Sequence, residues 1–118
     1  MTLYGDVVSI TATTAGVSGT ITVPMGARLL GLNIAGTENA AAVVISSVEI
    51  KWTGLQSPIK FVPNIVSCVE ANGSGVGTCK TPMIDLRKLP PVSNTNTVTI
   101  TITSTANITV EVGLMWVA

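Results

Sequence analysis

The sequence predicts an all-β protein built as an antiparallel β-sandwich or barrel. Apolar and polar residues alternate with a period of two in almost every segment, and hardly any segment has the apolar stripe of a helix. The alternating segments are rich in valine, isoleucine and threonine, whose branched side chains suit a pleated, half-buried surface. Turn residues separate these segments into about eight strands, a number typical of a sandwich or barrel.

The first half of the chain contains strands that are recognised by apolar residues of one parity. A turn at Pro24-Met25-Gly26 separates two of them, and only Ala40–Val44 favours a helical turn instead. We expect the inward-facing sets to be Val8, Ile10 and Ala12; Ile21 and Val23; Leu30, Leu32 and Ile34; and Val44, Val48, Ile50 and Trp52.

The second half begins with a short strand, Ile59 to Phe61, between Pro58 and Pro63. Because proline cannot donate to a strand ladder, this strand is expected at a sheet edge or corner. The clearest alternation lies near the C-terminus, with the inward sets Val98, Ile100 and Ile102, and then Ile108, Val110, Val112, Leu114 and Trp116. The threonines of residues 97–103 face the other way. This face is interpreted as solvated, as covered by a neighbouring subunit, or as suited to a flat ordered lattice.

The charge content indicates a protein that assembles with copies of itself. We expect one domain over residues 1–118, with roughly 6,000 Å² of accessible surface. Six basic and six acidic side chains serve that surface, the net charge is zero and histidine is absent. A chain that stays monomeric normally carries more charged side chains on its surface than this. We therefore predict that other copies of the chain cover much of the surface.

The same composition argues against several classes of function. Neutral net charge without a basic run disfavours specific nucleic-acid binding. The absence of histidine excludes Ser-His-Asp and Cys-His catalysis and, with two cysteines, disfavours a zinc site. The carboxylates are scattered, and Asp85 near Arg87 is interpreted as a surface ion pair. We therefore predict no enzyme activity, no catalytic residue, no small-molecule substrate, no metal and no cofactor.

The two cysteines, Cys68 and Cys79, are candidates for a disulfide. If a hairpin turns at Gly73-Ser74, its strands place the two cysteines directly opposite each other, near disulfide geometry. The alternative is a pair of free thiols in a reducing cytosol, which behave as small apolar residues. A disulfide indicates a site of action outside a reducing cell, or a thermophilic source.

Two sequons, Asn72-Gly73-Ser74 and Asn107-Ile108-Thr109, make Asn72 and Asn107 candidate glycosylation sites. Both lie in expected turns, although a chain rich in Thr, Ser and Asn contains such triplets by chance. No stretch has the roughly 18 apolar residues of a membrane helix, so we expect no transmembrane segment. The first residues lack the pattern of a signal peptide, so we expect synthesis in a cytosol or prior removal of a leader.

Two other functions fit a small β-sandwich. A carbohydrate-binding module presents aromatic platforms or calcium-binding carboxylates, whereas Trp52 and Trp116 continue the apolar parity of their strands and are expected to cap the core. An extracellular fibre or pilus subunit donates a strand to its neighbour. For that class we expect a secretion signal and a spare terminal strand, and the sequence shows neither.

The strand ending in Ile21-Thr22-Val23-Pro24, the turn Met25-Gly26-Ala27 and the strand from Arg28 to Ile34 lead to two long closing strands. This arrangement resembles the small single jelly-roll proteins that build virus particles, as capsomer, penton or cement subunits of tailless icosahedral viruses. The resemblance spans the whole chain and concerns strand number and style. It implies an eight-stranded jelly roll that works as a homo-oligomer with other virion proteins, located in the virion or, in the alternative functions, outside the cell. We expect contacts through apolar and threonine-lined strand faces and through loops near Met25, Leu55 and Pro90-Pro91.

Overall fold

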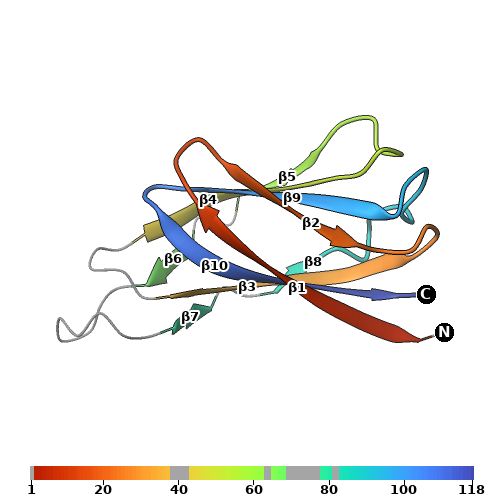
Figure 1. Ribbon diagram of the computed structural model, residues 1–118, viewed down its shortest axis with the longest axis horizontal. Helices are drawn as coiled ribbons and strands as arrows, with labels where there is room; N and C mark the ends of the chain where they lie inside the picture. Colours follow the sequence, from red (N-terminus) through yellow and green to blue (C-terminus); the bar gives the residue numbers. More distant parts are fainter. Residues whose placement is uncertain (1, 38–42, 63–64, 69–77, 81–82) are drawn as a thin grey trace.

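The computed structural model is a sandwich of two antiparallel β-sheets (Figure 1). It describes residues 2–37, 43–62, 65–68, 78–80 and 83–118; for residues 36–37, 65–68 and 78–80 it describes the backbone alone. Across these residues the secondary structure consists of strands, and no helix long and apolar enough to span a bilayer is found.

Ten strand segments in the described residues occupy eight positions, four in each sheet. Sheet A has the order β1-β10-β3, with β7 and β8 both pairing with β3; sheet B has the order β2-β9-β4, with β5 and β6 both pairing with β4. The strands of sheet A are β1 (Leu3–Ala12), β10 (Ile108–Val117), β3 (Arg28–Thr37), β7 (Thr78–Lys80) and β8 (Ile84–Asp85). Those of sheet B are β2 (Val17–Thr22), β9 (Thr97–Ser104), β4 (Val43–Lys51), β5 (Ile59–Phe61) and β6 (Ile65–Cys68).

The strand pairs are nested along the chain, as in one long hairpin. The outermost strands β1 and β10 pair, then β2 with β9, then β3 with β7 and β8, and finally β4 with β5 and β6. The hairpin is rolled so that β10 also pairs with β3 and β9 with β4. This nested and rolled order is that of a jelly roll, which confirms the fold class predicted from the strand pattern.

The core lies between the sheets and follows the predicted alternation in the long strands. Every second residue of β9 and β10 is buried, because successive side chains of a strand point to opposite faces. Trp52 and Trp116 are 2% and 6% exposed, as expected for residues that cap the core. The buried apolar residues include Ile10, Ile21, Val23, Leu29, Leu32, Ile34, Val43, Ile45, Val48, Ile50, Leu86, Val98, Ile100, Ile102, Val110, Val112 and Leu114.

Two predicted inward sets are wrong in one member each, and a bulge is the reason in both cases. An extra residue in β3, where Met115 pairs with Gly31 but Trp116 pairs with Leu29, buries Leu29 and leaves Leu30 half-buried. In β4 a register shift between Ile45 and Ser47 likewise buries Ile45 and leaves Val44 half-buried on the other face. One inserted residue reverses the parity of everything before it, so a strict period of two cannot predict these positions.

The expected pairing of Cys68 with Cys79 is absent at these two described ends of the hairpin, whose residues 69–77 lie outside the described ones. The backbone of Cys68 pairs with Val43 in sheet B, whereas that of Cys79 pairs with Gly36 in sheet A. The two segments therefore belong to opposite sheets. The helical turn expected at residues 40–44 is not formed at Val43 and Val44, which begin β4; residues 40–42 lie outside the described ones.

One end of the sandwich is closed by three loops that hydrogen-bond to one another. The turn after β2 joins the long loop before β9, since Gly26 N–H donates to Val92 O at 2.7 Å and Val92 N–H donates to Ala27 O at 2.9 Å. The turn after β4 joins the same loop, with Gly54 N–H donating to Ser93 O at 3.1 Å. Met25, Leu55 and Pro90, from the loops expected to make subunit contacts, thus share the end where both termini lie (Figure 1).

Gly54 tests whether these loop contacts hold the fold together. A Cβ built on Gly54 lies 2.6 Å from the backbone O of Ser93 and still closer to that residue's hydroxyl, so Gly54→Ala must push two hydrogen-bonded loops apart. We expect the free energy of unfolding, measured by urea denaturation, to fall by about 1–3 kcal/mol. In the control Gly113→Ala the nearest atom is Asn33 O at 3.9 Å, so stability stays within about 0.5 kcal/mol. Equal stability of the two variants would contradict the prediction.

Candidate assembly surface

The outer face of sheet B is lined with hydroxyl groups. The threonines of β9 at positions 97, 99, 101 and 103 are half-buried, and the Oγ atoms of Ser18 and Thr101 lie 2.7 Å apart across β2 and β9. Glu49 of β4 lies between Thr101 and Lys60 of β5 in the strand register. These polar groups make this face compatible with water, and the hydroxyls of Ser18 and Thr101 hydrogen-bond to each other.

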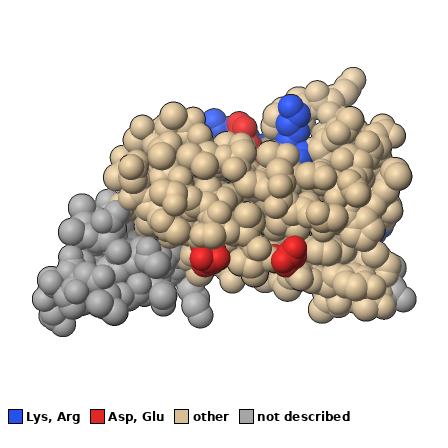
Figure 2. Space-filling view, in the orientation of Figure 1, with Lys and Arg blue, Asp and Glu red and all other residues tan. Residues whose placement is uncertain are grey.

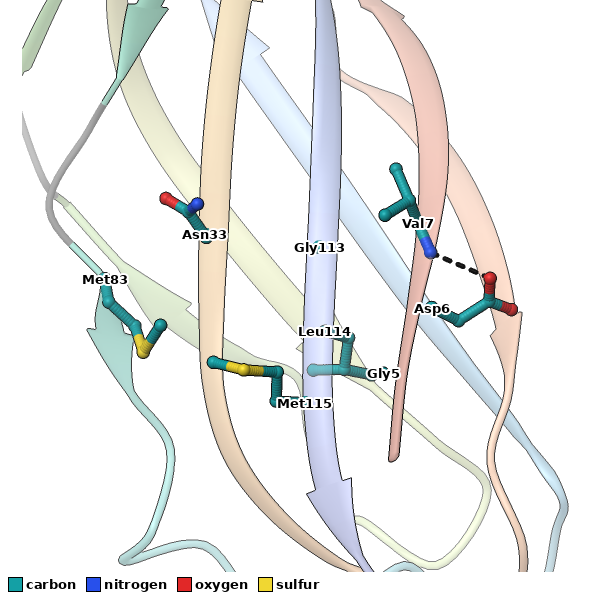
Figure 3. Close-up of a pocket in the computed structure, with 8 residues that line it drawn as sticks. All are labelled: Gly5, Asp6, Val7, Asn33, Met83, Gly113, Leu114 and Met115. Carbon is teal, nitrogen blue, oxygen red and sulfur yellow. Dashed lines mark hydrogen bonds between the residues drawn. The ribbon is translucent and has the colours of Figure 1, made fainter. Parts of the chain in front are cut away.

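The outer face of sheet A is apolar near the first half of β1 and polar toward the other end of the sheet, where the hydroxyls of Thr11 and Thr109 lie 3.1 Å apart. A shallow groove of about 410 Å³ crosses β1, β10 and β3 to the residue just before β8 (Figure 3). We call it the sheet-A groove; it is lined by Gly5, Asp6, Val7, Asn33, Met83, Gly113, Leu114 and Met115. Val7 and Met83 are 60% and 52% exposed and lie in the same groove, so their apolar surfaces form part of one patch, and contiguous apolar patches are typical of interaction sites.

Glycines form the floor of the sheet-A groove and let methionine side chains lie flat on it. A Cβ on Gly31 of β3 would stand 2.6 Å from Met83 Sδ, so the thioether occupies the space that any other residue would fill. Figure 3 shows the side chains of Met83 and Met115 extending toward each other over β3. Because methionine is flexible and polarizable, such a surface adapts readily to an apolar partner.

A second hollow of about 510 Å³ continues the groove past Met83 and Met115 toward a charged border. There Asp85 and Arg87 form a two-pronged ion pair, with Arg87 Nε donating to Asp85 Oδ1 and Nη2 donating to Oδ2, each at 3.0 Å. The backbone N–H of Arg87 also donates to Asp85 Oδ1 at 3.0 Å. The Arg87 side chain, and then its backbone N–H, lower the pKa of the Asp85 carboxyl to about 2.

The opposite border of the groove is the first half of β1, an edge strand that projects beyond the sandwich. Residues 3–7 are all exposed, and Leu3 is 62% exposed. Tyr4 stacks on Trp116 with ring centroids 6.1 Å apart and an angle of 19° between the rings. The Asp6 carboxylate accepts a hydrogen bond of 2.8 Å from Val7 N–H. These residues pair with β10, while no described strand pairs with the other edge of β1.

The charged side chains are sparse over the whole surface, as the composition implies. The accessible surface is 6194 Å², close to the value expected from the mass, and it carries the few charges of the sequence. Figure 2 shows a broad uncharged band with a few separated acidic and basic side chains above and below it. Among the described basic residues, Lys51 and Lys60 belong to sheet B, whereas Arg28 belongs to sheet A and Arg87 and Lys88 follow β8 of the same sheet.

The sites predicted from the sequence have different outcomes. Asn107 is exposed in the connection between β9 and β10, as expected, whereas Asn72 lies outside the described residues, so glycosylation of either stays a prediction. Cys68 and Cys79 are described by backbone only; the structure contains no disulfide among the described side chains. Among the described residues, no group of three potential metal ligands occurs. The buried indole N–H groups of Trp52 and Trp116 have no hydrogen-bond partner among the described residues.

Sequence reasoning missed the sheet-A groove and the exposed half of β1. The signal was present, because Gly5, Gly113 and Met115 all occupy the outward parity of strands whose inward residues were identified. It was not interpretable without strand order, since Met83 and Gly31 become neighbours only through the pairing of β8 with β3.

Comparisons with protein-family models, with curated proteins and with solved structures found no match.

The ion pair at the groove border gives a prediction for acid pH. We expect the Asp85 carboxyl to titrate near pH 2 in the folded protein, followed by NMR chemical shift, and to return toward 3.8 in Arg87→Gln. Because the folded-state pKa lies below the unfolded one, the stabilisation is complete above about pH 3.8 and is lost as the pH falls through about 2. A midpoint near 3.8 in the unmodified protein would exclude the ion pair in solution.

Proposed function

We propose that this chain is a structural subunit that assembles with copies of itself into a virion shell, vertex or cement layer. The observation that carries the proposal is the apolar sheet-A groove, which lies on the outside of a jelly roll that has very few charges. Jelly rolls are a common architecture of capsid proteins, although a fold alone does not determine a function.

The anatomy of sheet A supports an interface more than a solvated surface. The lining of its groove is formed mainly by glycine, valine and methionine together with one uncharged polar residue, Asn33, and its borders carry Asp6 on one side and the Asp85–Arg87 pair on the other. Protein interfaces have the same arrangement, with charge depleted at the centre and retained at the rim. Repetition of one such contact by closed symmetry allows a small chain to enclose a large volume.

The carbohydrate-binding alternative has less support. Stacking on a sugar ring needs an accessible aromatic face, and both tryptophans are almost fully buried. Tyr4 is exposed, but its ring stacks on Trp116, so one of its faces is already covered. A fibre subunit remains an alternative that electron microscopy of the purified protein distinguishes by the shape of the particles.

The proposal predicts a defined oligomer or particle at low micromolar concentration, measured by mass photometry and negative-stain microscopy. Met83→Glu places a charge on the exposed centre of the sheet-A groove, and burying it unpaired should weaken association by about tenfold or more. Thr20→Glu makes the same change on the hydroxyl-lined face of sheet B and should assemble like the unmodified protein.

A monomer at every concentration would overturn the proposed function. Normal assembly of Met83→Glu together with failure of Thr20→Glu would instead move the interface from sheet A to sheet B. Both variants change exposed residues, so equal thermal unfolding curves serve as the control for folding.

We further propose that Cys68 and Cys79 form a disulfide, which would link sheet B to sheet A, since β6 and β7 approach each other at that end. We expect both thiols to resist alkylation until a reductant is added, as measured by intact mass. Reduction should lower the free energy of unfolding by about 3 kcal/mol, because the loop between the cysteines is freed. Alkylation of both cysteines in the unreduced, denatured protein would contradict this proposal.

A further inference from the structure

The projecting half of β1 has a free backbone edge whose hydrogen-bonding groups can be assigned. Thr2 and Ala118 exchange two backbone hydrogen bonds, Thr2 N–H to Ala118 O at 3.0 Å and Ala118 N–H to Thr2 O at 3.1 Å. The β1–β10 register continues from there without a shift. Since antiparallel strands alternate between bonded and non-bonded pairs, Tyr4 and Asp6 direct their backbone groups to β10. Leu3, Gly5 and Val7 direct theirs to the open edge.

The Asp6 side chain occupies one of these open-edge donors. Val7 N–H, which has no partner in β10, donates to Asp6 Oδ1 at 2.8 Å (Figure 3). Natural proteins commonly protect edge strands with charged residues, because an unprotected edge pairs with any other strand. The neighbouring edge groups of Leu3 and Gly5 have no such cover among the described residues. The open-edge N–H of Val7 is therefore already hydrogen-bonded within the chain, whereas the open-edge groups of Leu3 and Gly5 are available to another strand.

We infer that β1 pairs antiparallel with β1 of a second copy of this chain, about a two-fold axis at Gly5, so that the two copies of sheet A become one continuous sheet. This inference names the partner and the contact for the proposed assembly and rests on that proposal. A second copy of the chain is the partner because the segment is self-complementary. A two-fold contact requires each residue to suit the residue that the axis places opposite it.

The register follows from the side chains of residues 3–7. With Gly5 on the axis, Leu3 lies opposite Val7 of the second copy, which pairs the two most exposed apolar side chains of the strand on the outer face. Asp6 then lies opposite Tyr4 of the second copy. A register with Asp6 on the axis would place two carboxylates directly opposite each other, which is unfavourable. Gly5 has no side chain to obstruct the close approach at the axis.

The pairing also extends the sheet-A groove. Gly5 and Val7 line the groove at its β1 border, so the two-fold axis joins the groove of one copy to that of the other. Val7 N–H exchanges the Asp6 carboxylate for the carbonyl of Leu3 in the second copy. Only a few backbone bonds form, so the edge contact by itself is weak and contributes in combination with the apolar groove.

A cysteine at the axis tests the register directly. Residues opposite each other in a bonded pair have Cα atoms about 5.5 Å apart, within the range that a disulfide bridges. A side chain at Gly5 fits, since its Cβ would lie 3.6 Å from Leu114 O and 3.7 Å from Met115 Cγ. We expect Gly5→Cys to form a covalent dimer on mild oxidation, identified by peptide mass mapping. Ser9→Cys is the matched control, because its two copies would stand roughly 27 Å apart in this register.

A proline at the edge gives a second measurement that does not depend on oxidation. Val7→Pro removes an N–H that points to the open edge and leaves the bonds to β10 in place. We expect fewer assembled molecules than in Ser9→Pro, which makes the same change outside the paired residues, with equal thermal unfolding of both variants. Suppose that the unmodified protein assembles. If Gly5→Cys then forms no cross-link, or if Val7→Pro assembles normally, the edge pairing is overturned and the proposed function still stands. A monomeric unmodified protein that forms no cross-link in Gly5→Cys would overturn both.

Discussion

The close packing of one face of each sheet against the other is the constraint on which the rest of this structure depends. Because side chains alternate along a strand, burial of Ile100, Ile102, Val110 and Val112 determines at the same time what lies on the outer faces. The bulges in β3 and β4 are part of this constraint. They insert one residue where the core needs a change of parity, and they transfer Leu30 and Val44 away from the interior.

The two outer faces that result have different physical characters. Sheet B exposes a row of hydroxyl groups, two of which, on Ser18 and Thr101, hydrogen-bond to each other. In its groove, sheet A exposes glycine backbone, Val7 and two thioethers, which water solvates poorly. Association through sheet A would thus bury the surface that is costly in water and leave the hydrated surface exposed. The loops that close one end are joined to one another by backbone hydrogen bonds of Val92 and Ser93.

The projecting half of β1 would determine the direction and register in which a second strand pairs beside the sheet-A groove. An apolar groove alone accepts many partners, whereas a strand edge imposes direction and register through its backbone groups. Asp6 restricts the edge further, since its carboxylate occupies Val7 N–H and disfavours registers that bring two such carboxylates together. In the proposed assembly, such a restriction would favour one geometry of association over indiscriminate edge pairing.

The sequence by itself determined the fold class, the long strands, the buried tryptophans and the scarcity of charge, because each of these depends on local alternation or on composition. The tertiary structure alone decided the strand order, the two bulges and the separation of Cys68 and Cys79 into opposite sheets. It also decided the candidate site, since Val7, Met83 and Gly113 are distant in the chain and meet only when the nested hairpin rolls. Pairing between distant strands depends on the combined packing of the whole core, and no local pattern in a single segment contains that information.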